Sequence, residues 1–118
     1  EVEVIDSNAG TRIAALTAAS VALADAGLPM RDLVAGTSVG KAGGKIIFDL
    51  NKDEEDAPDA VDIPVAILPS FKEFVLLQLD GLLTKKEFEQ AMAMANEASM
   101  KVHKLQVEAL KKKYDVEE

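Results

Sequence analysis

The sequence contains no cysteine, no tryptophan and a single histidine, His103, among its 118 residues. Without cysteine the chain has neither a disulfide framework nor a thiolate metal site, which favours an intracellular, cytoplasmic protein. A serine triad built on histidine would have to use His103, which lies in a charged helical segment with no nucleophile close to it. A surface or core-rim histidine is the simpler interpretation.

Aromatic residues make up only 4% of the chain, and basic residues (13) are outnumbered by acidic ones (21), for a net charge of −8. Base-stacking platforms are therefore scarce. The acidic balance argues against a stand-alone nucleic-acid binder, whose affinity depends on clustered basic groups, but not against a subunit whose basic surface comes from another chain. No apolar run approaches the roughly 20 residues of a membrane span, so we expect no membrane partner. A chain that begins at Glu1, without Met and inside an alternating segment, indicates a cut or processed protein.

The hydrophobic pattern predicts one α+β domain over residues 1-118, in the order β-α-β-β-β-β-α, with a mixed sheet packed by two helices. One helix is expected over residues 11–26, which are almost all small and aliphatic. The other is expected over residues 85–114, after a capping box at Thr84 and Glu87. The strands are expected at residues 1–5, 33–40, 45–50, 63–68 and 73–79, with the second and third forming a hairpin and the glycines of residues 33–40 allowing close approach.

The stretch from Ser7 to Arg12 ends the first expected strand and opens the first expected helix. Ser7 and Asn8 are good N-cap residues. The free N–H groups and the positive dipole end of a helix N-terminus suit an anion. Gly10 lets a ligand approach the backbone, Thr11 offers a hydroxyl group, and Arg12 can fork onto phosphate oxygens. These six residues alone leave two interpretations open, a phosphate site or an ordinary capped helix with a solvated arginine.

The segment from Asn51 to Asp62 is rich in carboxylates and is interrupted by Pro58, so the sequence predicts a loop there. A solvated, flexible loop is the simplest interpretation. A calcium-binding EF-hand is disfavoured because the segment has no glycine. The remaining alternative pairs Asp56 with Asp62, since two neighbouring carboxylates can hold a proton for a leaving group or share a hard metal ion.

The run from Asn8 to Ser20, continued from Ala22 to Leu33, resembles the RNase PH family, and within it the catalytic subunits of archaeal exosomes. Further matching segments are Val39-Gly40-Lys41, Asp49-Leu50-Asn51, Asp62-Ile63-Pro64-Val65-Ala66 and Gln78-Leu79-Asp80-Gly81. The resemblance covers essentially the whole chain. It implies that residues 1-118 are the C-terminal half of an RNase PH-type domain, which has the fold called ribosomal protein S5 domain 2-like.

The resemblance implies RNA phosphorolysis, in which inorganic phosphate attacks the last phosphodiester of an RNA 3′ end and releases a nucleoside diphosphate. In that family a glycine-hydroxyl-arginine turn holds the attacking phosphate, which implies that role for Gly10, Thr11 and Arg12. Two aspartates act at the leaving 3′ oxygen as general acid and Mg²⁺ ligand, and they match Asp56 and Asp62. Phosphoryl transfer needs such an anion clamp on one side and a proton or metal on the other.

The family also implies partners for this chain. These are an N-terminal half, which carries the arginines that grip RNA, and a related RNase PH-like subunit that alternates with it in a hexameric ring. The approach to Asp62 departs from the family's aromatic-Gly-Glu-Ala-Asp pattern, and the loop is one residue longer before Asp56, so Glu55 is an alternative for that position. The alternative function is a non-catalytic structural ring subunit, or an engineered or processed half-domain that kept the fold and lost activity.

Overall fold

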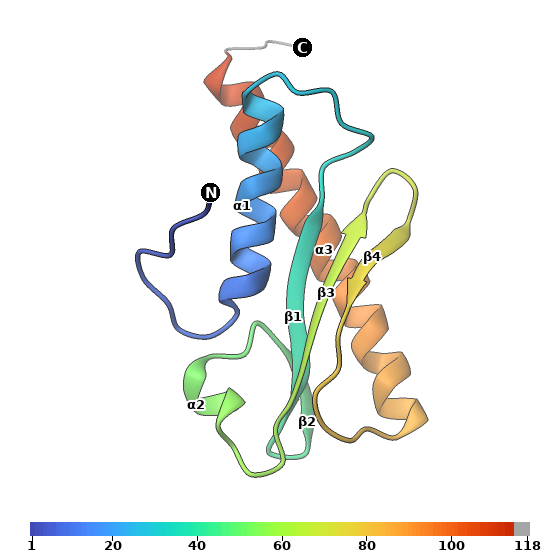
Figure 1. Cartoon of the computed structure of the whole chain (residues 1–118). Coiled ribbons are helices and arrows are strands. Elements are labelled where there is room, and N and C mark those ends of the chain that lie inside the picture. Colours follow the sequence, from blue (N-terminus) through green and yellow to red (C-terminus); the bar gives the residue numbers. More distant parts are fainter. Residues whose placement is uncertain (115–118) are drawn as a thin grey trace.

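The computed structural model describes residues 1–114, and their path is shown in Figure 1. The helices are α1 (Thr11–Asp25), α2 (Lys52–Glu55) and α3 (Lys85–Lys113). The strands are β1 (Ala35–Ala42), β2 (Lys45–Phe48), β3 (Val61–Leu68) and β4 (Glu73–Leu77), which form one sheet in the order β2-β1-β3-β4. Within this described part, none of the helices is both long enough and apolar enough to cross a bilayer.

The predicted α+β class, the two long helices and the β1–β2 hairpin are confirmed, but two features of the predicted sheet are wrong. The sheet is antiparallel throughout rather than mixed, because each strand runs opposite to its neighbour. Residues 1–5 form no strand, and Ile5 is 96% exposed. Alternating side chains are not enough for a strand, since its backbone N–H and C=O groups also need a neighbouring strand to bond with.

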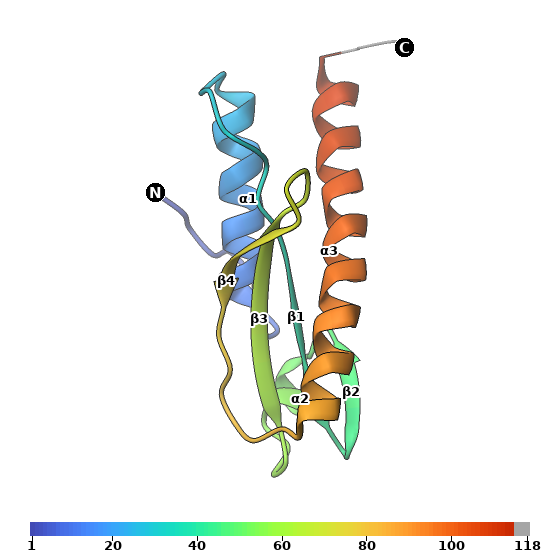
Figure 2. The ribbon, with the colours of Figure 1, turned by 90° about the vertical axis from the view of Figure 1, so that its right-hand side faces the viewer.

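The sheet lies between α1 and α3, as Figure 2 shows. The main hydrophobic core is on the α3 side, where odd-numbered residues of β1 and β3 meet two alanines of α3. Its buried members are Val39, Val61, Ile63, Val65, Ile67, Ala91 and Ala95. Because successive side chains of a strand point to opposite faces, the even-numbered residues of the same strands face the α1 side. This alternation turns Ser38 and Asp62 toward the N-terminus of α1.

Two glycines of β1 allow its neighbours to approach closely. A Cβ atom on Gly36 would lie 3.0 Å from Cγ2 of Ile13 and 2.9 Å from the carbonyl oxygen of Val65. A Cβ atom on Gly40 would lie 1.9 Å from the carbonyl oxygen of Val61. The close approach predicted for this glycine-containing strand is therefore confirmed, and the approaching groups are α1 on one side and the backbone of β3 on the other.

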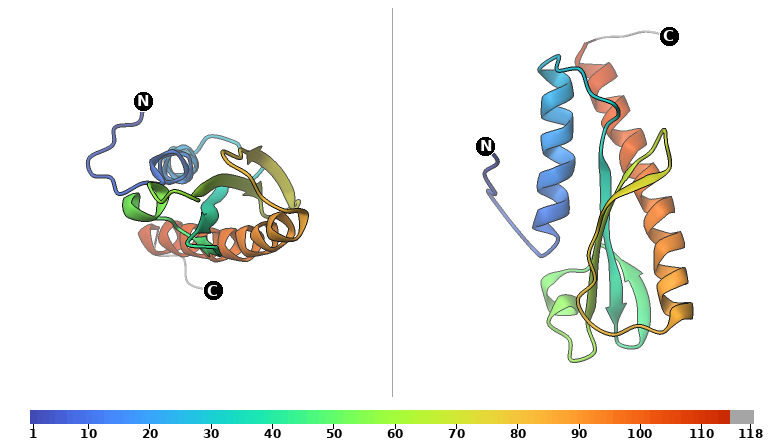
Figure 3. Two further views of the ribbon diagram at one scale, coloured as in Figure 1. Left: turned by 90° about the horizontal axis from the view of Figure 1, so that it is seen from below. Right: turned by 45° about the vertical axis from the view of Figure 1, so that its right-hand side comes forward.

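The two long helices converge beyond the edge of β1, on opposite sides of the sheet (Figure 3). The amide Nε2 of Gln106 donates hydrogen bonds to the carbonyl oxygens of Thr17 (3.2 Å) and Val34 (2.9 Å). At the helix ends, Lys113 and the Tyr114 hydroxyl bond to the carboxylate of Asp25 at 2.6 and 2.8 Å. The hydrogen bond from Lys113, which has the largest effect, and that from Tyr114 hold the pKa of Asp25 below its usual value. The C-terminal part of α3 is thereby fixed to α1.

The start of α3 is fixed by the predicted capping box, which is confirmed. The Thr84 hydroxyl accepts a hydrogen bond from the Glu87 amide, and the Glu87 carboxylate accepts one from the Thr84 amide, both at 3.1 Å. The same carboxylate forms a 2.8 Å ion pair with Lys41 at the end of β1. The first turn of α3 is thus bonded both to its own cap and to the sheet.

We expect Thr84→Ala to lower the free energy of unfolding by about 1 kcal/mol, because it removes the side-chain acceptor of the cap. Thr84→Ser keeps a hydroxyl group and is expected to stay close to the parent. Urea unfolding of the three proteins, followed by circular dichroism, measures the difference. Equal loss in the alanine and serine variants would contradict a capping role.

Candidate functional site

A cavity of about 310 Å³ lies at the N-terminus of α1. Its walls come from the turn before α1, from α1 itself, from β1 and β3, and from α2. The lining residues are Ser7, Ala9, Gly10, Thr11, Arg12, Ile13, Ser38, Lys52, Glu55, Asp62 and Pro64. The cavity therefore brings together four of the predicted site residues, Gly10, Thr11, Arg12 and Asp62.

The turn into α1 adopts an unusual backbone conformation that leaves the helix without a side-chain cap. Ala9 and Gly10 both have positive φ angles, 64° and 67°, and Gly10 occupies the N-cap position. The capping predicted for Ser7 and Asn8 is wrong, because no side chain within the described residues bonds to the first N–H groups of α1. Uncapped N–H groups beside a cavity are the arrangement in which a helix N-terminus can hold an anion.

The side chain of Asn8 instead joins this turn to α2. Its Oδ1 accepts a hydrogen bond of 3.1 Å from the amide of Lys52. The segment predicted as a loop thus contains a one-turn helix, capped by Asn51, whose Oδ1 accepts from the Glu54 amide at 2.9 Å. No residue of α2 is buried, which agrees with the exposed character predicted for the segment. Asn8 and Asn51 together place the start of α2 beside the α1 turn.

Arg12, in the first turn of α1, also lines the cavity and is linked to the sheet. Its guanidinium group donates a hydrogen bond to Oε1 of Gln78, the residue that follows β4. The backbone N–H of Gln78 in turn donates to the carbonyl oxygen of Pro64 at 3.1 Å. This bond links the exposed Arg12 side chain to the end of the sheet. Gln78 was not predicted as a site residue. The sequence analysis noted it only as part of Gln78-Leu79-Asp80-Gly81, one of the segments that carry the family resemblance.

Asp62 is fixed by both its side chain and its backbone. The hydroxyl of Ser38 donates a 2.7 Å hydrogen bond to its Oδ1. Its backbone N–H and C=O pair with Asp80, at 3.2 and 3.1 Å. In the β1–β3 register it stands opposite Gly40. Neither Ser38 nor Asp80 was predicted as a site residue, because their relation to Asp62 depends on the pairing of strands that are far apart in sequence.

Asp56, the other predicted catalytic carboxylate, is not among the residues that line the cavity. It ends α2 and forms a 3.1 Å ion pair with Lys52, one turn earlier. Its hydrogen bond to Lys52, helped by the charges of Asp56 and Glu55, raises the pKa of that lysine. Glu55 and Lys52 do line the cavity. Glu55 was the alternative that the sequence analysis gave for Asp56, because the loop is one residue longer. Lys52 was not predicted as a site residue, although its spacing of four residues from Asp56 is typical of a helical ion pair.

Asp62 and Glu55 are the carboxylates that line the cavity. Over residues 1–114, no group of three or more His, Cys, Asp or Glu side chains is placed to hold a metal ion. Mg²⁺ generally retains several waters and takes one or two protein carboxylates together with phosphate oxygens of a substrate. This donor set therefore fits a Mg²⁺ ion that shares its coordination with a phosphate-bearing ligand, and does not form a complete metal cage.

A second, larger cavity of about 840 Å³ lies between α1, β1 and α3. Small and apolar side chains dominate its lining, which includes Ile13, Ala18, Val21, Val102 and Leu105. His103 is partly buried on α3 and lines neither this cavity nor the smaller one, as the core-rim interpretation predicts. The larger cavity is a mainly apolar groove between two helices, and its charged lining residues include Asp25 and Lys113, which are paired with each other.

Comparison with known proteins identifies the class of protein that this fold and cavity define. The model of the 3′ exoribonuclease family, domain 2, which is the C-terminal domain of RNase PH, matches residues 32–98. The chain belongs to this family, and the predicted resemblance is confirmed. The crystal structure of rice (Oryza sativa) Rrp46 superposes with a TM-score of 0.81 at 20% identity, over 91% of this chain and 51% of that one, which confirms the fold.

Among individual proteins, the chain is similar to the exosome complex component Rrp41 of archaea. It is 54% identical to that of Thermococcus gammatolerans over 113 residues, which is 96% of this chain and 45% of the relative. It is 53% identical to that of Thermoplasma volcanium over 116 residues, which is 98% of this chain and 46% of the relative. The chain thus spans somewhat less than half the length of the curated relatives it matches.

We expect Asn8→Ala to speed amide hydrogen exchange at Lys52 by about tenfold, because it removes the acceptor of that N–H. Asn8→Asp retains an acceptor oxygen and is expected to keep the protection. Residue-resolved exchange measured by NMR distinguishes this contact from the cap predicted by sequence. If Asn8 were the cap of α1, the alanine variant would instead expose the amides of Thr11 to Ile13.

Proposed function

We propose that the chain carries the phosphate site of a phosphate-dependent 3′-5′ exoribonuclease and works as part of a subunit of an exosome-like ring. The proposal rests chiefly on one observation, the cavity in which the Gly10-Thr11-Arg12 turn faces Asp62. Membership of the 3′ exoribonuclease family supports it. The cavity places a helix N-terminus without a side-chain cap beside a carboxylate, and phosphorolysis needs a group that can hold an anion and one that can serve the leaving oxygen.

In this mechanism inorganic phosphate binds at the uncapped N-terminus of α1, with the Thr11 hydroxyl and the Arg12 guanidinium as further donors. An oxygen of this phosphate attacks the phosphorus atom of the last phosphodiester of the RNA. The bond from that phosphorus to the 3′ oxygen of the preceding nucleotide breaks, and the terminal nucleotide leaves as a nucleoside diphosphate. The leaving 3′ oxygen takes up a proton as the bond breaks. Asp62 serves it either by giving that proton or as a residue that would hold Mg²⁺, in which case the proton would come from water.

The second carboxylate comes, we propose, from the C-terminal end of α2. The sequence predicts Asp56 for this role, whereas Glu55 is the residue that lines the cavity beside Asp62. Asp56 is paired with Lys52, so its carboxylate is already engaged by a cation. When bound, Mg²⁺ would neutralise charge that develops on the leaving oxygen. Asp62 and Glu55 would be its protein ligands, and substrate phosphate would supply the others.

RNA binding requires partners beyond this chain. Of its two arginines, Arg12 is assigned here to the attacking phosphate, and Arg31 is paired with Glu73 (3.3 Å) and lies over the ring of Phe71 (4.2 Å). The net charge of −8 also disfavours a grip on a polyanion. We therefore propose that an N-terminal half, in the same polypeptide or in a second one, packs into the apolar groove between α1 and α3 and supplies basic groups for the RNA 3′ end. A related RNase PH-like subunit would complete a hexameric ring.

The central test is release of nucleoside diphosphates from single-stranded RNA by the chain assembled with its N-terminal half, with and without phosphate. We expect activity only with phosphate. Arg12→Ala is expected to raise the KM for phosphate by at least about tenfold, since a charge-assisted donor is lost. Arg31→Ala, the chain's other arginine, is the matched control and is expected to leave the KM unchanged.

Activity that persists in Arg12→Ala combined with Asp62→Ala would contradict the proposal. Absence of turnover, together with no change in the amide signals of Gly10 to Arg12 in saturating phosphate, would favour the alternative of a structural subunit that lost catalysis. The departure of the acidic segment from the family pattern is the observation that favours this alternative.

We expect Asp62→Asn to lower kcat by about 100-fold or more, as for loss of a general acid or metal ligand. Glu55→Gln is expected to lower kcat by at least about tenfold, and Asp56→Asn by less, because only Glu55 lines the cavity. All three changes remove one charge with little change of volume, so the comparison is matched. A larger loss in Asp56→Asn than in Glu55→Gln would restore Asp56 to the role that the sequence predicts.

A further inference from the structure

We propose that Asp59 is a positioning residue, whose carboxylate fastens the acidic segment between α2 and β3 to the β1–β2 turn. The catalytic consequence of this contact rests on the proposed function, whereas the contact itself does not. Asp59 is exposed and lies in the segment that joins α2 to β3.

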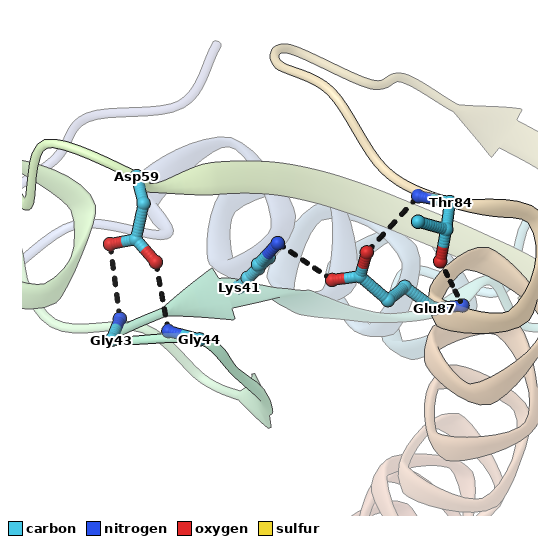
Figure 4. A network of polar contacts seen from close by, with 6 residues as sticks. All are labelled: Lys41, Gly43, Gly44, Asp59, Thr84 and Glu87. Carbon is cyan, nitrogen blue, oxygen red and sulfur yellow. Dashed lines mark hydrogen bonds and ion pairs between the residues drawn. The ribbon is translucent and has the colours of Figure 1, made fainter.

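The contact is a pair of hydrogen bonds to one turn, shown in Figure 4. Oδ1 of Asp59 accepts from the backbone N–H of Gly43 at 3.1 Å, and Oδ2 accepts from that of Gly44 at 2.8 Å. The two glycines have φ angles of 58° and 75° and connect the paired residues Ala42 and Lys45. A two-residue hairpin turn with positive φ at both positions directs neither N–H into the ladder, so both remain available to one carboxylate.

The charge of Asp59 strengthens this contact. The N–H groups of Gly44 and then Gly43 hold the pKa of the Asp59 carboxyl below its usual value, and the charge of Lys41 adds to the effect. Lys41 is itself oriented by its 2.8 Å ion pair with Glu87 at the start of α3 (Figure 4). At neutral pH the carboxylate is therefore ionised, and both hydrogen bonds are charge-assisted.

The acidic segment has few other restraints near its end. Asn8 holds the start of α2 through Lys52, but α2 has no buried residue. Asp62 is already fixed by β3, Ser38 and Asp80. Asp59 therefore restrains the residues that precede it in the chain, at the end of α2, which include Glu55 and Asp56. Loss of the contact between Asp59 and the β1–β2 turn is expected to make the positions of those carboxylates less fixed. The Gly10-Thr11-Arg12 turn and Asp62 are expected to stay where they are.

The first arm of the test measures the contact itself and does not depend on RNA phosphorolysis. Amide hydrogen exchange is measured in Asp59→Ala and Asp59→Asn. The matched control is Asp53→Asn, which removes a carboxylate of α2 that has no bonding partner within residues 1–114. We expect exchange at Gly43 and Gly44 to rise by about tenfold or more in Asp59→Ala, as for loss of hydrogen bonds to a charged acceptor. Exchange at Glu55 and Asp56 should rise with it, while that at Asp62 stays unchanged.

The second arm uses pH. Because the pKa of Asp59 is lowered on folding, its contribution is complete at neutral pH and is lost as the pH falls through the folded-state pKa. Protection factors at Gly43 and Gly44 should fall in that range in the parent and in Asp53→Asn. In Asp59→Asn they should be lower at neutral pH and should not show this fall.

The third arm measures RNA phosphorolysis by the assembled protein. We expect Asp59→Ala to lower kcat by about tenfold with the KM for phosphate unchanged. The reason is that a displaced carboxylate affects the chemical step and not the binding of phosphate at the Gly10-Thr11-Arg12 turn. Unchanged exchange at Gly43 and Gly44 in Asp59→Ala would overturn the contact. Raised exchange at these glycines with no change at Glu55 and Asp56, or with kcat equal to that of Asp53→Asn, would overturn the positioning role. If the parent itself shows no phosphorolysis, the proposed function fails and the exchange at Glu55 and Asp56 decides the role of Asp59.

Discussion

The pairing of β1 with β3 is the constraint on which the rest of the structure depends. Seven residue pairs, from Ala35 with Ile67 to Lys41 with Val61, hold the two strands together. One face of this ribbon supplies most of the core beneath α3. The other face supplies Ser38 and Asp62 to the cavity at the N-terminus of α1. A shift of one residue in this register would exchange the two faces and remove both the core and the site.

Features with a local cause were predictable from the sequence. Thr84 and Glu87 form the expected capping box, because the bonds of a cap join residues three positions apart. The hairpin at Gly43 and Gly44 follows from glycine's tolerance of positive φ. The grouping of Gly10, Thr11 and Arg12 also has a local origin, since these residues are consecutive at the start of one helix.

The wrong or missing predictions concern contacts between distant segments. Residues 1–5 alternate as a strand would, but no strand in the described residues pairs with them. Asn8 is a good N-cap by residue type, yet its side chain accepts a hydrogen bond from the amide of Lys52, 44 residues away. The choice between Glu55 and Asp56 depends on the rotation of α2, which is set by Asn51 and by its neighbours in space. Residue type and spacing do not contain this information.

The contacts around the cavity at the N-terminus of α1 also have a consequence for the order of folding. Asn8 and Lys52 are 44 residues apart, and Arg12 and Gln78 are 66 residues apart. Closing loops of this length costs chain entropy before any of these bonds can form. Pairing of the intervening strands shortens the loops that remain to be closed, so we expect these contacts to form after the β1–β2 hairpin and α3. The cavity at the N-terminus of α1 would then be one of the last parts of a newly made chain to take its final shape.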